Sequence, residues 1–302
     1  MISLVVPIFN EEDLIDELLR RVVNALEQTN VPFEVITVDD GSKDTSLNKL
    51  LQWHQNDRRI KVLTLSRNFG HQAAYTAGID YAEGDYIAMM DGDLQDPPEL
   101  LPQMYNMLCS GEYDIICGLR TDRKETGIRK LLIKGFHRVF RTGSGSVANT
   151  GNFSMLNKKA TDAFRDLKEK TRYLPGLRNF IGFKQGNIEY ERDERWAGTP
   201  KMSIFKLFTL AADAIFSFSK FPIKFCLYIG LLGIIISFAA GLYILFSKLL
   251  GLAPLGWSST MTSIFFLGSI QLTFLGVLGE YVFRIYKESQ NRPIYIIKDF
   301  YS

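Results

Sequence analysis

The sequence predicts an α/β domain built on an open, mostly parallel sheet, followed by two membrane-spanning helices. Two features predict this combination. Over the first 120 residues, apolar runs of strand length alternate with segments of helical periodicity, as in repeated strand–helix–strand units. From residue 225 to residue 283, by contrast, only two of 59 residues are charged, namely Lys248 and Glu280.

The strands of the α/β domain are expected to be buried on both faces. Runs such as EVITVDD are apolar up to their acidic end rather than alternating, which is typical of parallel strands covered by helices on both sides. Right-handed crossovers then connect successive strands. The predicted strands are residues 2–7, 33–39, 60–65, 85–90 and 114–117, and the predicted helices between them are 11–28, 43–52, 72–81 and 97–108.

Composition and motifs exclude several classes of protein. The 35 basic and 33 acidic residues give a formal charge of +2, which does not favour nucleic acid as a partner. The three cysteines and three histidines are scattered, so neither a disulfide framework nor a zinc site is expected. The first strand is not followed by G-x-G-x-x-G, and no P-loop occurs, which argues against a nicotinamide-dependent enzyme and a P-loop NTPase.

Two uncharged runs predict the membrane helices. Residues 225–246 carry no charge, and residues 262–283 carry only Glu280. Each run of 22 residues would form a helix of about 33 Å, enough to cross a hydrocarbon core of about 30 Å. The alternative is a pair of buried core helices, but both runs exceed the length expected for those. Residues 247–261 contain glycine, proline and serine and are expected to form the loop of a hairpin.

The charges that flank the two runs predict their orientation. Lys220 and Lys224 precede the first run, basic residues follow the second, and the loop between holds only Lys248. The positive-inside rule therefore places the catalytic domain and both termini in the cytoplasm, in a multi-pass protein of the cytoplasmic (inner) membrane. The expected organisation is a catalytic domain over 1–200, an interfacial amphipathic helix over 201–224, two transmembrane helices within 225–283, and a cytoplasmic tail over 284–302.

A second segment with an expected membrane role is strongly basic. Residues 120–141 hold eight Lys or Arg against two acidic residues, and their apolar residues recur at helical spacing. The simplest interpretation is a solvated basic helix face. Next to a membrane anchor, attraction to anionic lipid or to a lipid phosphate is an equally good interpretation.

Polar side chains gather where the predicted strands end. Four of the five strands are followed by carboxylates or amides, and in an open parallel sheet ligands bind beyond these carboxyl ends. Asp91 and Asp93, separated by one glycine, are able to face one cation, and carboxylates select hard divalent ions. A lone D-x-D is a weak signal, but its position at a strand end opposite Asp39 and Asp40 strengthens it.

Several segments of the sequence together resemble a known family. The segments VVPIFNEE, VDDGSKD, SRNFGHQ and DGDLQDPPE, in this order and spacing, resemble family 2 glycosyltransferases of the Rossmann-like GT-A fold. The later segments RYLPGLRNFIGFKQGNIEYERDERWAGTPKMS and GEYVFRIYKESQNRPIY are similar to bacterial polyisoprenyl-phosphate glycosyltransferases, relatives of dolichyl-phosphate mannose synthase. The resemblance covers essentially the whole chain.

The resemblance implies an activity and a set of site residues. The activity is inverting transfer of one sugar from a nucleotide-sugar, with uridine as the expected base, to a polyisoprenyl (undecaprenyl) phosphate, for modification of cell-envelope glycans. It also implies a homo-oligomer. Because two spans offer no path for the product, a separate flippase is expected to carry it across the membrane. The metal, Mg²⁺ or Mn²⁺, is assigned to Asp91, Asp93 and Gln95; catalysis to Asp91, Asp93, Arg120 and Arg195; and donor binding to Pro7, Asn10, Glu11, Asp39, Asp40, Arg129 and Lys201.

Physical chemistry supports these assignments, although for Arg195 and Lys201 a solvated charge beside the membrane is an alternative. Negative charge builds on the leaving diphosphate, which a divalent ion and arginine stabilise. The acceptor phosphate has a second pKa near 6, so a general base is not required. Two departures from the family remain: Asn152 stands where relatives often have Asp, which excludes a catalytic base there, and Pro200 precedes Lys201.

Two other functions compete with this interpretation. A processive polysaccharide synthase of the same superfamily would carry Q-x-x-R-W, but the matching residues begin with Arg192, and two spans are too few for a polymer channel. A catalytically silent membrane scaffold that binds nucleotide is the alternative from another class, because fold alone does not establish turnover. The sequence does not identify the sugar.

Overall fold

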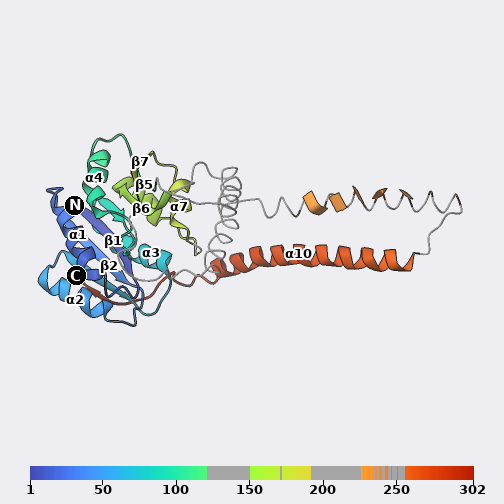
Figure 1. Ribbon diagram of the computed structural model, residues 1–302, viewed down its shortest axis with the longest axis horizontal. Coiled ribbons are helices and arrows are strands. Elements are labelled where there is room, and N and C mark those ends of the chain that lie inside the picture. Colours follow the sequence, from blue (N-terminus) through green and yellow to red (C-terminus); the bar gives the residue numbers. More distant parts are fainter. Residues whose placement is uncertain are drawn as a thin grey trace. The chain divides into compact units, whose positions relative to one another are not determined.

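The computed structural model describes residues 1–120, 150–170, 172–191 and 256–302, together with scattered positions between 226 and 250 (Figure 1). Its α/β part starts with β1 (Ile2–Ile8), α1 (Ile15–Glu27), β2 (Phe33–Asp39), α2 (Ser46–Asn56), β3 (Ile60–Leu65), α3 (His71–Tyr81) and β4 (Tyr86–Met89). It continues with the 3-10 helix η1 (Pro98–Leu100), α4 (Leu101–Cys109), β5 (Ile115–Arg120), β6 (Thr150–Asn157), α6 (Lys158–Arg165), α7 (Leu174–Phe180) and β7 (Gln185–Tyr190). The five predicted strands and four predicted helices are confirmed, with ends shifted by a few residues.

The described strands form one mixed sheet in the order β7-β5-β6-β4-β1-β2-β3-β8, where β8 is Ile297–Tyr301. The central strands β4, β1, β2 and β3 are parallel, as predicted. β6 is antiparallel to both β4 and β5, while β7 runs parallel to β5. The carboxyl ends of β1, β2 and β4 therefore meet at one edge of the sheet.

The sheet is covered on both faces, which explains the continuous apolar strands. Every residue of β1 and β2 is buried. Alternate β1 residues pack in one core cluster with α1 and α4, while Val5 faces the opposite side. There a Cβ on Gly78 of α3 would lie 2.2 Å from Val5 Cγ1 and 3.0 Å from Val38 Cγ2. Gly78 thus lets α3 lie close to the sheet, with its N-terminus next to the strand ends.

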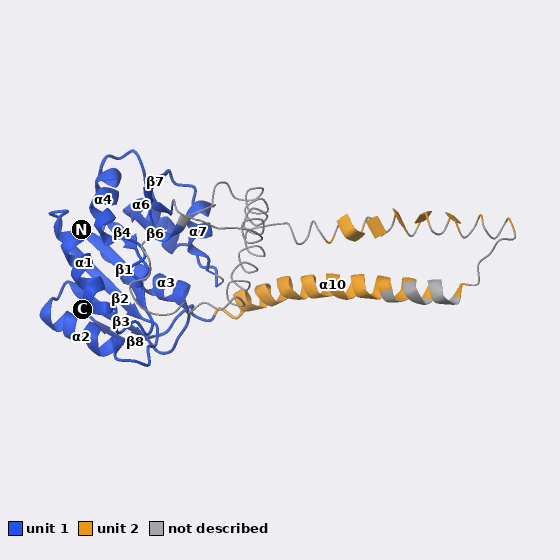
Figure 2. Cartoon of the chain, viewed as in Figure 1, with its two compact units in different colours: residues 1–207, 292–302 blue, residues 208–291 orange. Residues whose placement is uncertain are grey.

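The C-terminal residues return to this sheet. β8 pairs antiparallel with β3, and the Ser66 amide donates to the carbonyl of Ile296 at 2.9 Å. Phe300 packs edge-on against Tyr81 of α3, and the Tyr295 hydroxyl donates to Asp80 at 2.7 Å. Residues Met1–Leu207 and Arg292–Ser302 consequently form one compact unit, and Phe208–Asn291 form a second (Figure 2).

The second unit contains a long apolar helix, α10 (Trp257–Ser289). It includes the predicted span 262–283, and its segment Phe266–Ser289 is long and apolar enough to cross a membrane, with none of it buried inside the protein. Glu280, the one charge in the predicted span, pairs with Arg284 one turn later at 2.8 Å. The first predicted span, 225–246, is described only at scattered helical positions, so the two-helix hairpin is not established. The predicted interfacial helix 201–224 lies outside the described residues.

Candidate active site

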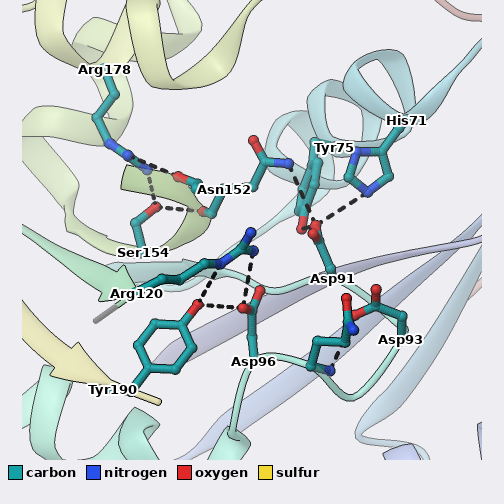
Figure 3. Close-up of polar contacts among 12 residues, drawn as sticks. His71, Tyr75, Asp91, Asp93, Asp96, Arg120, Asn152, Ser154, Arg178 and Tyr190 are labelled. Carbon is teal, nitrogen blue, oxygen red and sulfur yellow. Dashed lines mark hydrogen bonds and ion pairs between the residues drawn. The ribbon is translucent and has the colours of Figure 1, made fainter. Parts of the chain in front are cut away.

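Asp91 directly follows the last buried residues after β4 and receives donors from two other elements (Figure 3). The Tyr75 hydroxyl on α3 donates to Asp91 Oδ1 at 2.7 Å, and His71 Nε2 lies 3.2 Å from the same oxygen. Asn152 Nδ2 on β6 makes a longer contact with it at 3.5 Å. All three contacts end on Oδ1, so among the described residues the other carboxylate oxygen is not used and is able to bind a ligand.

The charges around Asp91 reinforce this arrangement. Burial raises the pKa of Asp91, but the neighbouring His71 and the hydrogen bonds from His71 and Tyr75 outweigh it, so the net pKa is well below the ordinary value. The reverse holds for His71: burial lowers its pKa, and Asp91 more than compensates, so the net pKa is raised. Asp91 is therefore ionised at neutral pH.

The turn that carries Asp93 and Gln95 is tightly constrained. A Cβ on Gly92 would lie 2.8 Å from Ile8 Cδ1 and 2.9 Å from the Pro7 carbonyl, so only glycine fits between Asp91 and Asp93. Leu94 is buried and has a φ of 56°, a left-handed conformation that is unusual for a leucine. After it, the Gln95 amide donates to Asp93 Oδ1 at 3.2 Å. Strain of this kind is concentrated at functional sites.

The residues present fit a hard divalent ion held largely by a ligand's own oxygens. Asp91, Asp93 and Gln95 supply oxygen donors, which Mg²⁺ and Mn²⁺ prefer. Among the described residues, no group of three or more His, Cys, Asp or Glu is placed to hold a metal. One or two carboxylates completed by substrate phosphates and water is the usual arrangement for Mg²⁺ in phosphate-handling sites.

The predicted nucleotide-binding residues lie at the ends of β1 and β2. Asn10 adopts a φ of 54°, its amide donates to Ser42 Oγ at 3.0 Å, and its Oδ1 accepts from the Lys43 amide at 2.8 Å. Glu11 is anchored through its amide, which donates to Ser46 Oγ at 2.9 Å. These bonds join the turn after Pro7 to the turn after β2. The structure thus brings the two turns together, as the parallel topology predicts.

Asp39 and Asp40 are both buried, and each accepts hydrogen bonds from the backbone of a loop. Asp39 accepts from the Ser42 amide at 3.2 Å. Asp40 accepts from the amides of Phe69 and Gly70 at 2.7 and 3.0 Å, so both of its oxygens hold the loop that leads into α3. Burial raises the pKa of both carboxyl groups, and the hydrogen bonds from the backbone oppose this only in part.

Arg120 is the last residue of β5. It lies on the side of Asp91 opposite to His71 and Tyr75 (Figure 3). Its Nε donates to the Tyr190 hydroxyl at 3.0 Å and its Nη2 lies 3.2 Å from Asp96 Oδ1. Burial lowers the pKa of Arg120, but Asp96 and Tyr190 outweigh it and raise the net pKa. The remaining basic residues of the prediction, Arg129, Arg195 and Lys201, lie outside the described residues.

Sequence reasoning missed four side chains of this site: His71, Tyr75, Asp96 and Tyr190. His71 and Asp96 lie within segments that carried the family resemblance, SRNFGHQ and DGDLQDPPE, but neither was assigned a role. Tyr75 follows His71 by one helical turn, a spacing that places both on one face of α3. No signal in the sequence pointed to Tyr190.

Comparison with known proteins agrees with this geometry. Residues 3–165 match Glycosyl transferase family 2. The chain belongs to this family. The matched region runs from β1 to the end of α6 and includes the strand-end carboxylates and Arg120, whereas β7, α10 and β8 lie beyond it.

Relatives of this family 2 glycosyltransferase match along its whole length. An uncharacterised glycosyltransferase of Synechocystis, sll0501, is 39% identical over 99% of this chain and 95% of its own length. YkcC of Bacillus subtilis, also an uncharacterised glycosyltransferase, is 40% identical over 99% of this chain and 94% of its own. The bactoprenol glucosyl transferase of Shigella phage SfV is 36% identical over 99% of this chain and 98% of its own.

Proposed function

We propose that this family 2 glycosyltransferase transfers one sugar, with inversion, from a nucleotide-sugar to a polyisoprenyl (undecaprenyl) phosphate. The donor is a UDP-sugar, and the product is a lipid-linked monosaccharide used to modify cell-envelope glycans. The observation that carries the proposal is the meeting of Asp91, Asp93 and Arg120 at one edge of the sheet, in a chain with a long apolar helix. The name of the Shigella phage relative, bactoprenol glucosyl transferase, supports the lipid acceptor.

Each group of site residues has a separate role in this reaction. An oxygen of the acceptor phosphate forms a bond to the anomeric carbon while the bond from that carbon to the nucleotide diphosphate breaks. Asp91, Asp93 and Gln95 would hold Mg²⁺ or Mn²⁺, which when bound neutralises charge on the diphosphate. Arg120 stabilises the same developing charge through its guanidinium. Asn10, Glu11 and the turn after Asp39 line the nucleotide, and Arg129, Arg195 and Lys201 are assigned to the phosphates.

The acceptor explains why the site needs no general base. A phosphate monoester is largely ionised at neutral pH, because its second pKa is near 6. Asn152, an amide that contacts Asp91, accordingly takes no proton from the acceptor. Its donor group instead stabilises the ionised form of the metal-binding carboxylate.

The connectivity of the two units supports a membrane hairpin. Because β8 is hydrogen-bonded to β3, residues on both sides of the segment 208–291 belong to one sheet. A sheet cannot be hydrogen-bonded through a bilayer, so that segment crosses the membrane an even number of times. If α10 crosses once, a second crossing must fall between residues 208 and 256, where the span 225–246 is predicted. Flanking Lys and Arg favour a cytoplasmic catalytic unit.

Sugar transfer in detergent tests the proposal. The purified chain is incubated with undecaprenyl phosphate and a panel of radiolabelled nucleotide-sugars, with Mg²⁺, Mn²⁺ or EDTA. We expect one sugar to enter the lipid fraction, with the product lost in EDTA and reduced about a hundredfold in Asp93→Asn. Asp162→Asn, a carboxylate change on the exposed surface of α6, is the matched control. A folded protein that binds UDP but transfers no sugar from any donor would instead be a nucleotide-binding scaffold.

A further inference from the structure

Arg120 is held by residues from three other parts of the sheet domain. On β5 and β7, Arg120 and Tyr190 are neighbours across the final rung of the parallel ladder. The Tyr190 hydroxyl also donates to Asp96 Oδ1, so one arginine, one tyrosine and one aspartate form a closed triangle (Figure 3). Asp96 is fully buried and Arg120 is 17% exposed.

The ring of Tyr190 is itself fixed by packing. Phe153 on β6 contacts it edge-on, with ring centroids 5.7 Å apart. On its neighbouring strand, a Cβ on Gly118 would lie 2.8 Å from Tyr190 Cε1, so the absence of a side chain at Gly118 makes room for the ring. The hydroxyl therefore has a defined position, from which it contacts Asp96 and Arg120.

The guanidinium of Arg120 lies against Gly151 on β6. A Cβ on Gly151 would lie 3.1 Å from Arg120 Nη2 and 3.4 Å from Cζ. β6 is held at this point by Arg178, which is buried and donates to the Gly151 carbonyl at 3.0 Å and to Ser154 Oγ at 2.7 Å. The guanidinium is thus confined between the Asp96–Tyr190 pair and a fixed strand.

This confinement leaves part of the guanidinium for a ligand. Nε and Nη2 are used within the triangle, whereas Nη1 makes no hydrogen bond or ion pair with the residues that the structure describes. Asp91 lies close enough to Arg120 for the two charges to interact. An anion that approaches Asp91 together with a cation is therefore attracted by the charge of Arg120, and Nη1 is the guanidinium nitrogen that the triangle does not use.

We propose that Asp96 and Tyr190 are positioning residues that hold the Arg120 guanidinium towards the diphosphate of the nucleotide-sugar. This inference rests on the proposed function, because it takes the donor to carry a diphosphate. A long arginine side chain loses rotational freedom when it meets a ligand, and fixing it beforehand removes that loss from the transition state. Residues that orient the ligands of a metal ion typically contribute 10–100-fold to activity, and we expect an effect of this order for the residues that orient Arg120.

Steady-state kinetics of the full chain in detergent test the inference by a double-mutant cycle. Tyr190→Phe removes only the hydroxyl and keeps the ring packed on Phe153. Gly151→Ala displaces the guanidinium from the opposite side. We expect each to lower kcat about tenfold or more with little change in KM for the nucleotide-sugar, because the interaction strengthens in the transition state. In an Arg120→Gln background, neither change should lower kcat further.

The Arg120→Gln background distinguishes a loss of Arg120 positioning from a general loss of protein stability. If the effects of Tyr190→Phe and Arg120→Gln multiply, or if Tyr190→Phe has wild-type kcat, the inference is overturned. Tyr86→Phe is the matched control and should retain wild-type kcat. It also removes one tyrosine hydroxyl, but at the amino end of β4, away from the end that Asp91 follows.

A parallel titration separates this inference from the proposed function. If the wild-type chain transfers no sugar but binds UDP with Mn²⁺, the same cycle is measured on the UDP affinity, because UDP carries on its terminal phosphate the negative charge that the nucleotide-sugar develops only in the transition state. Coupling between Tyr190 and Arg120 there would retain the inference while the proposed transfer fails, and additive effects would overturn it. A wild-type chain that binds no UDP overturns both.

Discussion

The Tyr75 hydroxyl donates to Asp91 Oδ1 at 2.7 Å and is the shortest of three contacts that converge on this oxygen. Tyr75 is fully buried in α3, and the ring of His71 packs edge-on against it at 4.8 Å. The orientation of Asp91 is thus set by a helix that packs on the centre of the sheet rather than by its own turn.

Replacing Tyr75 with phenylalanine should weaken the response to the divalent ion. The change removes one donor to Asp91 and retains the ring, so Asp91 loses orientation while the core stays packed. We expect the Mn²⁺ concentration for half-maximal transfer to rise about tenfold. A metal titration of transfer activity measures this. An unchanged Mn²⁺ requirement, with Tyr86→Phe as the reference, would contradict the role of Tyr75.

Replacing Asp40 with asparagine should chiefly lower stability. The two amides of Phe69 and Gly70 both need an acceptor, and the NH₂ group of asparagine would face one of them as a second donor. A buried unsatisfied group of this kind costs about 2–3 kcal/mol. We expect thermal unfolding in detergent to occur about 5–10 °C lower. Asp13→Asn, an exposed carboxylate in the turn before α1, should change the midpoint little.

Stability should depend on pH through Glu34, which is buried on β2. Burial raises the pKa of Glu34, but the contacts from Lys61 Nζ at 2.8 Å, the Ser3 hydroxyl and the Glu83 amide at 2.8 Å outweigh it, and the net pKa is lowered. Because the folded-state pKa is below the ordinary value of 4.5, Glu34 stabilises the fold fully above that pH. This contribution is lost as the pH falls through 4.5 towards the lower folded-state value.

Thermal unfolding from pH 7 to pH 3.5 checks the Glu34 prediction. The wild-type midpoint should fall more steeply below pH 5 than that of Glu34→Gln, which carries no titrating group at this position. Parallel curves for the two proteins would show that other carboxylates account for the acid sensitivity.

The proposed hairpin predicts which positions face the outside of the cell. In chains with Cys109 and Cys226 replaced by serine, cysteines are introduced as Ser258→Cys, before the span of α10, or as Ser302→Cys, beyond β8. With the cytoplasmic membrane intact, an impermeant maleimide should label the first and not the second. Labelling of both, or of Ser302→Cys alone, would contradict the proposed orientation.

The central elements were predictable because their signals are local. Buried parallel strands produce unbroken apolar runs, and the acidic ends of β2 and β4 mark the edge where ligands are expected to bind. The partners of the site were not predictable in this way. Tyr190 reaches Arg120 only because β7 pairs with β5. The role of Asp40 in holding the loop before α3 depends on a hydrogen bond from Phe69, 29 residues later in the chain.

The edge strand β8 was also missed, for a related reason. IKDFY has a weak strand pattern next to a long apolar helix, and its partner β3 lies more than 230 residues earlier. Nothing in the two segments taken separately indicates that they pair.

This late pairing sets an order of events during synthesis. Residues 1–207 leave the ribosome with the outer edge of β3 unpaired, and the strand that covers it is made only after α10. An uncovered edge is a site for wrong pairing with other chains. The sheet of this protein is therefore finished only after its apolar helix has been synthesised, so a chain that ends before β8 keeps an aggregation-prone edge.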